Sequence, residues 1–145
     1  MAVQRAFRVT LSYSERSFKV DSAARIEKIA PASEAIEGAE RQSGSWFALE
    51  DAKGRTLYRR HVVDPRREQR EVFTGEEREM RRTRVAAPSG ILPILVPDME
   101  GAEALVLYAS DTDEAGTEAP ARPVFKVSMR DIAVMAAKQG GGHGR

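Results

Sequence analysis

The sequence contains no cysteine among its 145 residues. This absence excludes a thiol nucleophile, a disulfide framework, a cysteine-ligated zinc ion and an iron–sulfur cluster. Histidine is almost as scarce, since only His61 and His143 are present. Two histidines are too few for most transition-metal sites. We therefore expect neither a metal ion nor another cofactor.

Long apolar runs and a large net charge are also lacking. No run approaches the roughly 20 apolar residues that a membrane-spanning helix needs. Lys and Arg total 23 and Asp and Glu total 22, so the net charge of +1 gives no global attraction to nucleic acid. Residues 1–6 lack the basic start and apolar stretch of a signal peptide. These features predict a cytoplasmic protein without a membrane segment.

The sequence does contain enough apolar residues for a folded core, arranged with the period of strands. They make up 41% of the chain, which excludes a chain that is disordered throughout. Apolar and polar residues alternate over residues 7–13 and again over 124–129, as in a strand with one buried face. The turn sequence at residues 51–54 separates two further strands, expected at 46–50 and 56–63.

Other segments are predicted from shorter patterns. Strands are expected at residues 18–20, 71–74, 84–87, 91–96 and 104–109. The apolar run 91–96 suggests burial on both faces, but Pro93 lacks an N–H group and therefore belongs on a sheet edge or at a bulge. The spacing of Ile26 and Ile29 fits either an irregular strand or a helical turn. Residues 31–44 are expected to form a loop, which also admits a short helix over 33–42 with Ser33 as its N-cap.

About eight short strands with turn sequences between them predict an all-β fold. The expected architecture is an antiparallel immunoglobulin-like sandwich, with a small barrel as the alternative. The sandwich is expected to occupy residues 1–130. Residues 131–145 are expected to hold a short helix over 131–138 and a disordered glycine-rich tail.

Catalytic motifs are sparse. A serine nucleophile needs a base, usually histidine, but His143 lies in the glycine-rich tail and His61 ends an expected strand, where surface or packing roles are more common. There is also no Gly-x-Ser-x-Gly motif. We therefore expect no enzymatic activity. The alternative is a hydrolase that uses His61, which requires Ser43 or Ser45 within hydrogen-bond reach of that ring.

The motifs for metal ions and phosphates are incomplete. Residues 111–116 begin like a calcium loop, but Ala115 stands at position five and Arg122 at position twelve, where glutamate is required. An acidic solvated loop is the better interpretation. The glycines at 140–142 are not followed by the lysine and helix of a phosphate-binding loop.

Arginine is the most informative polar residue, with 18 copies against 5 of lysine. Residues 59–84 contain nine arginines and six acidic residues, a balance of +3, whereas residues 98–118 contain seven acidic residues and no basic one. Three interpretations compete: solvated faces in a high-GC bacterial composition, a protein interface that exploits bidentate arginine, and nucleic-acid binding. The interspersed glutamates argue against nucleic acid because they repel phosphates.

The aromatic pair Trp46 and Phe47 adds a second signal for an interface. Adjacent residues of a strand point to opposite faces. Either one ring is exposed beside the arginines as a binding hot spot, or both faces of a central strand are covered.

Three segments of the chain are similar to known families: residues 43–60 (SGSWFALEDAKGRTLYRR), 95–98 (LVPD) and 104–108 (ALVLY). They resemble uncharacterised small bacterial β-sandwich proteins, and are loosely similar to the N-terminal sandwich region of some IgA-type metallopeptidases. The resemblance covers about half of the chain and implies an accessory domain. It implies no peptidase activity, because the chain has no His-Glu-x-x-His motif.

We therefore expect a non-catalytic binding or adaptor module that acts through protein–protein contacts or self-association. A structural subunit of a larger homo- or hetero-oligomeric assembly is the alternative. The residues expected to contact a protein partner cluster around the central hairpin and just after it: Trp46, Tyr58, Arg59, Arg60, Arg66 and Arg67.

Overall fold

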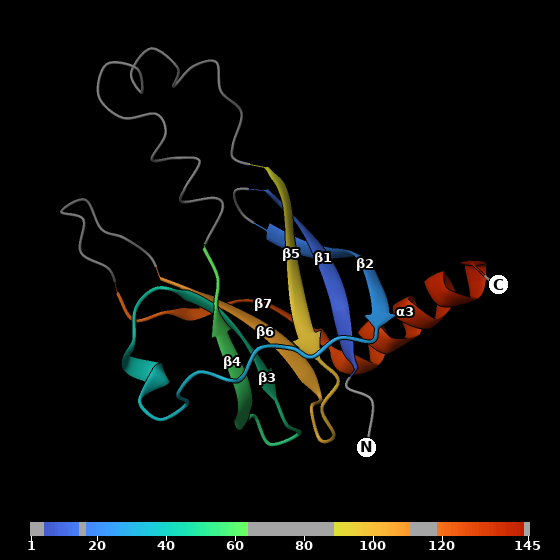
Figure 1. Ribbon diagram of the computed structural model, residues 1–145. Coiled ribbons are helices and arrows are strands. Elements are labelled where there is room, and N and C mark those ends of the chain that lie inside the picture. Colours follow the sequence, from blue (N-terminus) through green and yellow to red (C-terminus); the bar gives the residue numbers. More distant parts are fainter. Residues whose placement is uncertain (1–4, 15–16, 64–88, 111–118, 144–145) are drawn as a thin grey trace, which may run out of the picture.

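The computed structural model of the chain describes residues 5–14, 17–63, 89–110 and 119–143 (Figure 1). The strands predicted at residues 71–74 and 84–87 lie outside these residues, as do Arg66, Arg67 and the acidic loop at 111–116.

The described residues form two antiparallel sheets and a C-terminal helix (Figure 1). A three-stranded sheet has the order β2-β1-β5 and a four-stranded sheet has the order β4-β3-β6-β7. This arrangement confirms the all-β sandwich, with seven strands in the described part of the chain. The strands and helices are β1 (Ala6–Ser14), β2 (Ser17–Ile26), η1 (Ala39–Arg41), β3 (Ser45–Glu50), β4 (Thr56–His61), β5 (Gly90–Pro97), β6 (Ala104–Ala109), β7 (Arg122–Ser128) and α3 (Met129–His143).

The core lies between the two sheets, and the predicted alternation accounts for it. In β1 the odd-numbered residues 7–13 are buried, whereas Arg8 on the opposite face is exposed. The four-stranded sheet contributes Phe47 and Leu49 from β3 and Leu105 and Leu107 from β6. Burying one face of each sheet is the standard solution for two packed antiparallel sheets.

The central hairpin forms as the sequence predicts. Gly54 has a φ of 81° and donates its N–H group to the Asp51 carbonyl at 3.0 Å. The Asp51 carboxylate accepts hydrogen bonds from the N–H groups of Lys53 and Arg55. These bonds, led by the one from Arg55, outweigh desolvation and lower the pKa of Asp51. The turn therefore depends on both a glycine and a fixed carboxylate.

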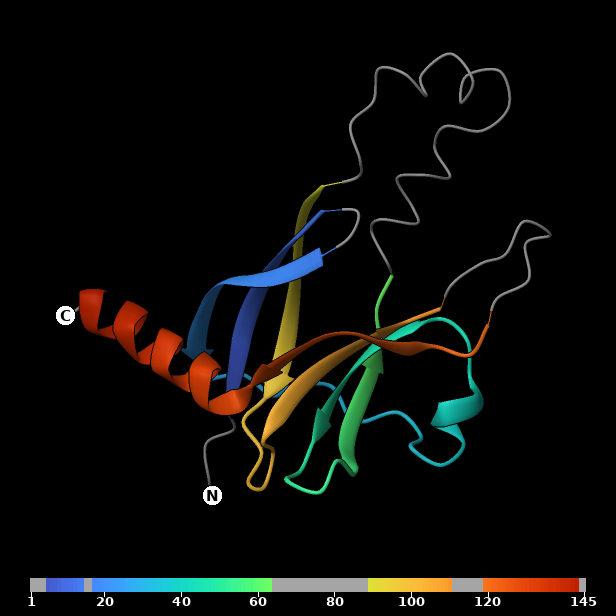
Figure 2. The ribbon, with the colours of Figure 1, turned by 180° about the vertical axis from the view of Figure 1, so that it is seen from behind.

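Helix α3 begins directly after β7 and packs against β2 (Figure 2). The Ser128 hydroxyl accepts a hydrogen bond from the Asp131 N–H group at 3.0 Å, as an N-cap does. Met129, Ile132 and Ala136 are buried in the core. The helix continues to His143, beyond the end predicted at residue 138. Each glycine at 140–142 costs about 1 kcal/mol relative to alanine, so packing of the first turns supports the helix better than propensity does. No helix among the described residues is long and apolar enough to cross a membrane.

Strand β5 is an edge strand, which confirms the position predicted from Pro93. The expected burial on both faces is wrong at the start of the strand, where Ile91 is 63% exposed. Among the described residues, β5 pairs with β1 and with no other strand, so its outward side chains receive less cover.

The segment that connects β2 to β3 is a loop, as the sequence predicts, and its regular structure is limited to η1. The short helix that the sequence also admits over residues 33–42 does not form. Residues 31–36 instead lie against β4, to which they are hydrogen-bonded, and we call them the strap. Ser33 caps no helix there, because its hydroxyl oxygen accepts a hydrogen bond from the Arg59 N–H group.

Candidate functional site

Strand β4 is an edge of the four-stranded sheet, and the strap covers that edge. The Glu34 N–H group donates to the Arg59 carbonyl at 2.9 Å. In return, the Arg59 N–H group donates to the Ser33 hydroxyl at 3.1 Å, and the His61 N–H group donates to Glu34 Oε1 at 3.1 Å. Two of these three bonds use side-chain oxygens. The strap thus supplies the hydrogen bonds of a neighbouring strand without being one.

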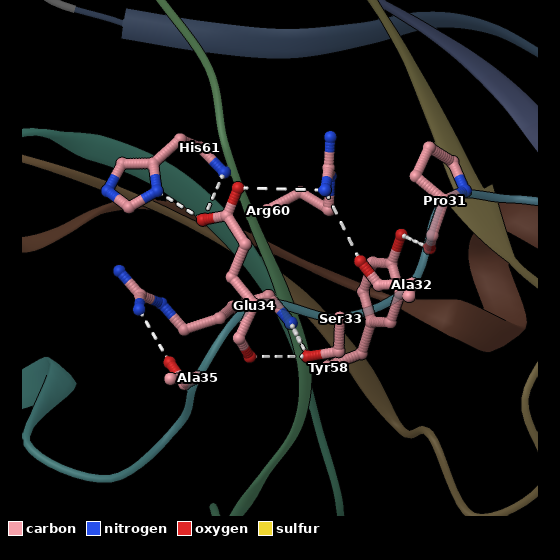
Figure 3. A network of polar contacts seen from close by, with 9 residues as sticks. Pro31, Ala32, Ser33, Glu34, Ala35, Tyr58, Arg60 and His61 are labelled. Carbon is pink, nitrogen blue, oxygen red and sulfur yellow. Dashed lines mark hydrogen bonds and ion pairs between the residues drawn. The ribbon is translucent and has the colours of Figure 1, made fainter.

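The Glu34 carboxylate joins two side chains of β4 (Figure 3). Its Oε1 atom is hydrogen-bonded to Nδ1 of the His61 ring, and its Oε2 atom lies 3.7 Å from Nη1 of Arg60. In the register of β3 and β4, Arg60 lies opposite the core-facing Phe47, whereas His61 lies opposite Trp46 on the other face. The Glu34 carboxylate therefore contacts one side chain from each face of β4, at the edge of the sheet.

These three side chains remain partly in solvent. The exposed fractions are 50% for His61, 37% for Arg60 and 30% for Glu34. Partial burial raises the pKa of Glu34, but the hydrogen bonds from the His61 ring and backbone, together with the charges of His61 and Arg60, outweigh that effect. The pKa of Glu34 therefore lies below its ordinary value of 4.5, and the carboxylate is ionised at neutral pH. We call these three residues the Glu34 surface.

Tyr58 and Arg60 also bind carbonyl groups of the strap. The Tyr58 hydroxyl donates to the Pro31 carbonyl at 2.6 Å, and Arg60 Nη1 donates to the Ala32 carbonyl at 3.3 Å (Figure 3). Tyr58 is only 4% exposed, and this burial raises the pKa of its hydroxyl. The strap is thus fixed to β4 by side chains as well as by the backbone.

Arg59 is buried, with an exposed fraction of 2%. Its Nη1 atom donates to the Ala35 carbonyl at 2.6 Å and its Nη2 atom donates to Gln42 Oε1 at 3.0 Å. The Cζ atom lies 4.4 Å from the centre of the Trp46 ring, a cation–π distance. The guanidinium group therefore connects the strap to the outer face of the four-stranded sheet.

A row of stacked groups continues from Arg59 across that outer face. The rings of Trp46 and Tyr108 are stacked with their centres 5.4 Å apart, and the Tyr108 hydroxyl donates to the Glu50 carboxylate. Burial, together with the hydrogen bond and charge of Glu50, raises the pKa of Tyr108. The His61 ring meets the edge of Trp46 at 5.8 Å between centres. His61 belongs to both the buried row and the exposed Glu34 surface.

The structure brings four of the predicted binding residues together but exposes few of them. Trp46, Tyr58 and Arg59 are buried. Of the predicted binding residues that the structure describes, Arg60 therefore has the side chain that a partner can reach. Trp46 and Phe47 are each 3% exposed, which confirms the alternative in which both faces of a central strand are covered. Strand β3 lies between β4 and β6, and Arg59 covers the ring on the outer face.

Glu34 and Ser33 are the site residues that the sequence does not reveal. They lie in a segment with no strand pattern, and Glu34 and His61 are 27 positions apart in the sequence. The Ser-Glu pair is equally typical of a helix start, which is the role predicted for Ser33.

The contact that a His61-dependent hydrolase would need is not formed. Within the described part of the chain, neither Ser43 nor Ser45 is hydrogen-bonded to His61, whose Nδ1 atom is instead engaged by Glu34. The Ser45 carbonyl accepts a hydrogen bond from the Val62 N–H group at 3.0 Å. Among the described residues there is also no group of three or more potential metal ligands.

Comparison with known proteins gives no match, either to a family model or to a curated protein. The resemblance to small bacterial β-sandwich proteins and to the sandwich region of IgA-type metallopeptidases therefore stays a prediction.

Proposed function

We propose that this β-sandwich, which we regard as immunoglobulin-like in type, is a non-catalytic binding or adaptor domain that works through protein contacts. The partner contacts the Glu34 surface. One observation carries this proposal: a single ionised carboxylate holds Arg60 and His61 in place while large parts of both side chains remain in solvent.

The fixed orientation of these side chains favours binding. Immobilising a flexible side chain at an interface costs about 0.5–1.5 kcal/mol, and that cost is smaller for a side chain that is already held in the free protein. Arginine is enriched at protein interfaces because its planar group can form two parallel hydrogen bonds to a carboxylate. Arg60 combines an existing contact to Glu34 with solvent access.

The proposal is tested by affinity capture from a lysate of the source cells with quantitative mass spectrometry. The test variant is Arg60→Ser combined with His61→Ser. The matched control is Arg8→Ser, which removes an exposed arginine from the outer face of the other sheet. Arg59 is unsuitable as a test position because it is buried.

We expect the wild type and the Arg8→Ser control to recover the same partner. The double variant should recover at least about fivefold less, the effect of losing roughly 1 kcal/mol of binding free energy. Equal recovery with all three proteins, or no partner that is specific to the wild type, would overturn the proposal.

A further inference from the structure

A groove lies beside the Glu34 surface, between the strap, the start of β4 and the turn after β5. Its volume is about 660 Å³ and it is lined by four separate parts of the chain. Residues from the strap and β4 form one wall, and Pro97, Asp98 and Met99 form another. Leu57 and Met99 give the groove an apolar part, while Arg5 and Asp98 give it charge.

The two charges in the groove are not equivalent. The negative charge of Asp98 is compensated by Arg25, because the Asp98 Oδ2 atom lies 2.5 Å from Nη1 of Arg25. The Asp98 N–H group donates to the Arg5 carbonyl at 3.1 Å, which fixes the backbone of Arg5 at the rim. The Arg5 guanidinium is exposed and makes no ion pair or hydrogen bond with the described residues. The groove therefore presents one uncompensated positive charge.

The backbone beside the groove also offers hydrogen-bond donors. The carbonyl groups of Pro31 and Ala32 are already bound by Tyr58 and Arg60. In contrast, the N–H groups of Ala30 and Ala32 donate to no other group in the described residues. A ligand that supplies acceptors fits this stretch better than one that supplies donors.

We infer that this groove binds an extended segment of a partner protein that carries an acidic side chain beside small apolar residues. The carboxylate pairs with Arg5, main-chain carbonyls of the segment accept from Ala30 and Ala32, and the apolar side chains cover Leu57 and Met99. The groove shares the strap with the Glu34 surface, so the inference rests on the proposed function and specifies the ligand chemistry. A basic segment is disfavoured by the charge of Arg5.

Panning a random heptapeptide phage library against the immobilised full-length chain tests the inference without a known partner. We expect enrichment of peptides with one Asp or Glu next to Ala, Val or Pro. An enriched peptide is then synthesised with a fluorophore, and its dissociation constant is measured by anisotropy. Replacing its acid by the amide should weaken binding roughly two- to fivefold, as for an exposed ion pair.

Three protein variants locate the contact. Arg5→Gln should weaken binding of the acidic peptide by the same factor and abolish the difference in affinity between the acid and amide peptides. Arg25→Gln leaves the charge of Asp98 uncompensated and should also weaken binding of the acidic peptide. Arg8→Gln makes the same change at an exposed arginine of β1 that does not line the groove, and it should have no effect.

The inference is overturned if no peptide is enriched, if the enriched peptides lack an acidic residue, or if Arg5→Gln leaves the acid preference intact. Failure here is distinguishable from failure of the proposed function. If partner capture depends on Arg60 but peptide binding is unchanged by Arg5→Gln, only the proposal for the groove is overturned. If the binding of acidic peptides depends on Arg5 but partner capture is unchanged by the Arg60 and His61 substitutions, only the role of the Glu34 surface is overturned.

Discussion

Replacing Arg59 by alanine should destabilise the fold, in contrast to the surface role that its sequence position predicts. The substitution removes two hydrogen bonds from a charged donor, to Ala35 and Gln42, and the cation–π contact with Trp46. Hydrogen bonds to charged groups contribute about 1.5–3 kcal/mol each and a desolvated cation–π contact about 2 kcal/mol. The cost of burying the charge offsets a large part of this sum. We expect a net loss of about 2–4 kcal/mol in the free energy of unfolding.

Urea denaturation followed by tryptophan fluorescence measures this loss. Trp46 is the only tryptophan, and Arg59 lies over its ring, so the signal reports on the contact that is removed. Arg60→Ala is the matched control, because its 3.7 Å ion pair with Glu34 and its 3.3 Å hydrogen bond to the Ala32 carbonyl are both open to solvent and should together contribute at most about 1 kcal/mol. Equal losses in the two variants would refute the structural role that the buried geometry assigns to Arg59.

Three other substitutions test separate contacts. Glu34→Gln should reduce stability at pH 7, and the difference from the wild type should close as the pH falls below 4.5, the ordinary pKa of the carboxyl group. The reason is that a lowered pKa stabilises the folded state only while the carboxylate is ionised. Urea midpoints at pH 7 and pH 3 measure this difference, and an equal difference at both pH values contradicts the prediction. Tyr108→Phe removes the hydrogen bond to the buried Glu50 and should cost about 1–3 kcal/mol near neutral pH. It should also flatten the loss of stability as the pH rises above 10, because the raised pKa of Tyr108 keeps its proton in the folded state; midpoints at pH 9 and pH 11 that fall equally in variant and wild type would argue against it. Ser128→Ala removes the N-cap of α3 and should cost about 1 kcal/mol, whereas Ser128→Asp, which can cap equally well, should be neutral in thermal denaturation followed by circular dichroism.

The parts of the fold that the sequence predicts are those that depend on local patterns. The alternation in residues 7–13 places Phe7 and Val9 in the core, and the same rule locates β7. The hairpin between β3 and β4 follows from a turn that needs a glycine with positive φ at Gly54. Pro93 marks an edge strand because it has no N–H group to donate to a neighbouring strand.

The candidate site could not be predicted in the same way, because its contacts are distant in sequence. Alternation places Arg59 on the same face of the sheet as Trp46, but it does not show that this second face is covered. The cover comes from the strap, whose residues lack a periodic pattern and bind β4 through Ser33 and Glu34. The sequence of a surface that a loop covers resembles that of a solvated surface, which is why the sequence predicts Arg59 as a partner contact.

The protection of the sheet edges bears on how a partner can bind. Ser33 and Glu34 already occupy outward N–H groups of β4, and on β5 neither Pro93 nor Pro97 has an N–H group to donate. At the opposite side of the sandwich, α3 packs against β2. A partner that added a strand to β4 would have to displace the strap, and with it the bonds of the buried Arg59 guanidinium to Ala35 and Gln42. Recognition through side chains of the Glu34 surface and the adjoining groove requires no such displacement, and it leaves the edge contacts that stabilise the sandwich in place.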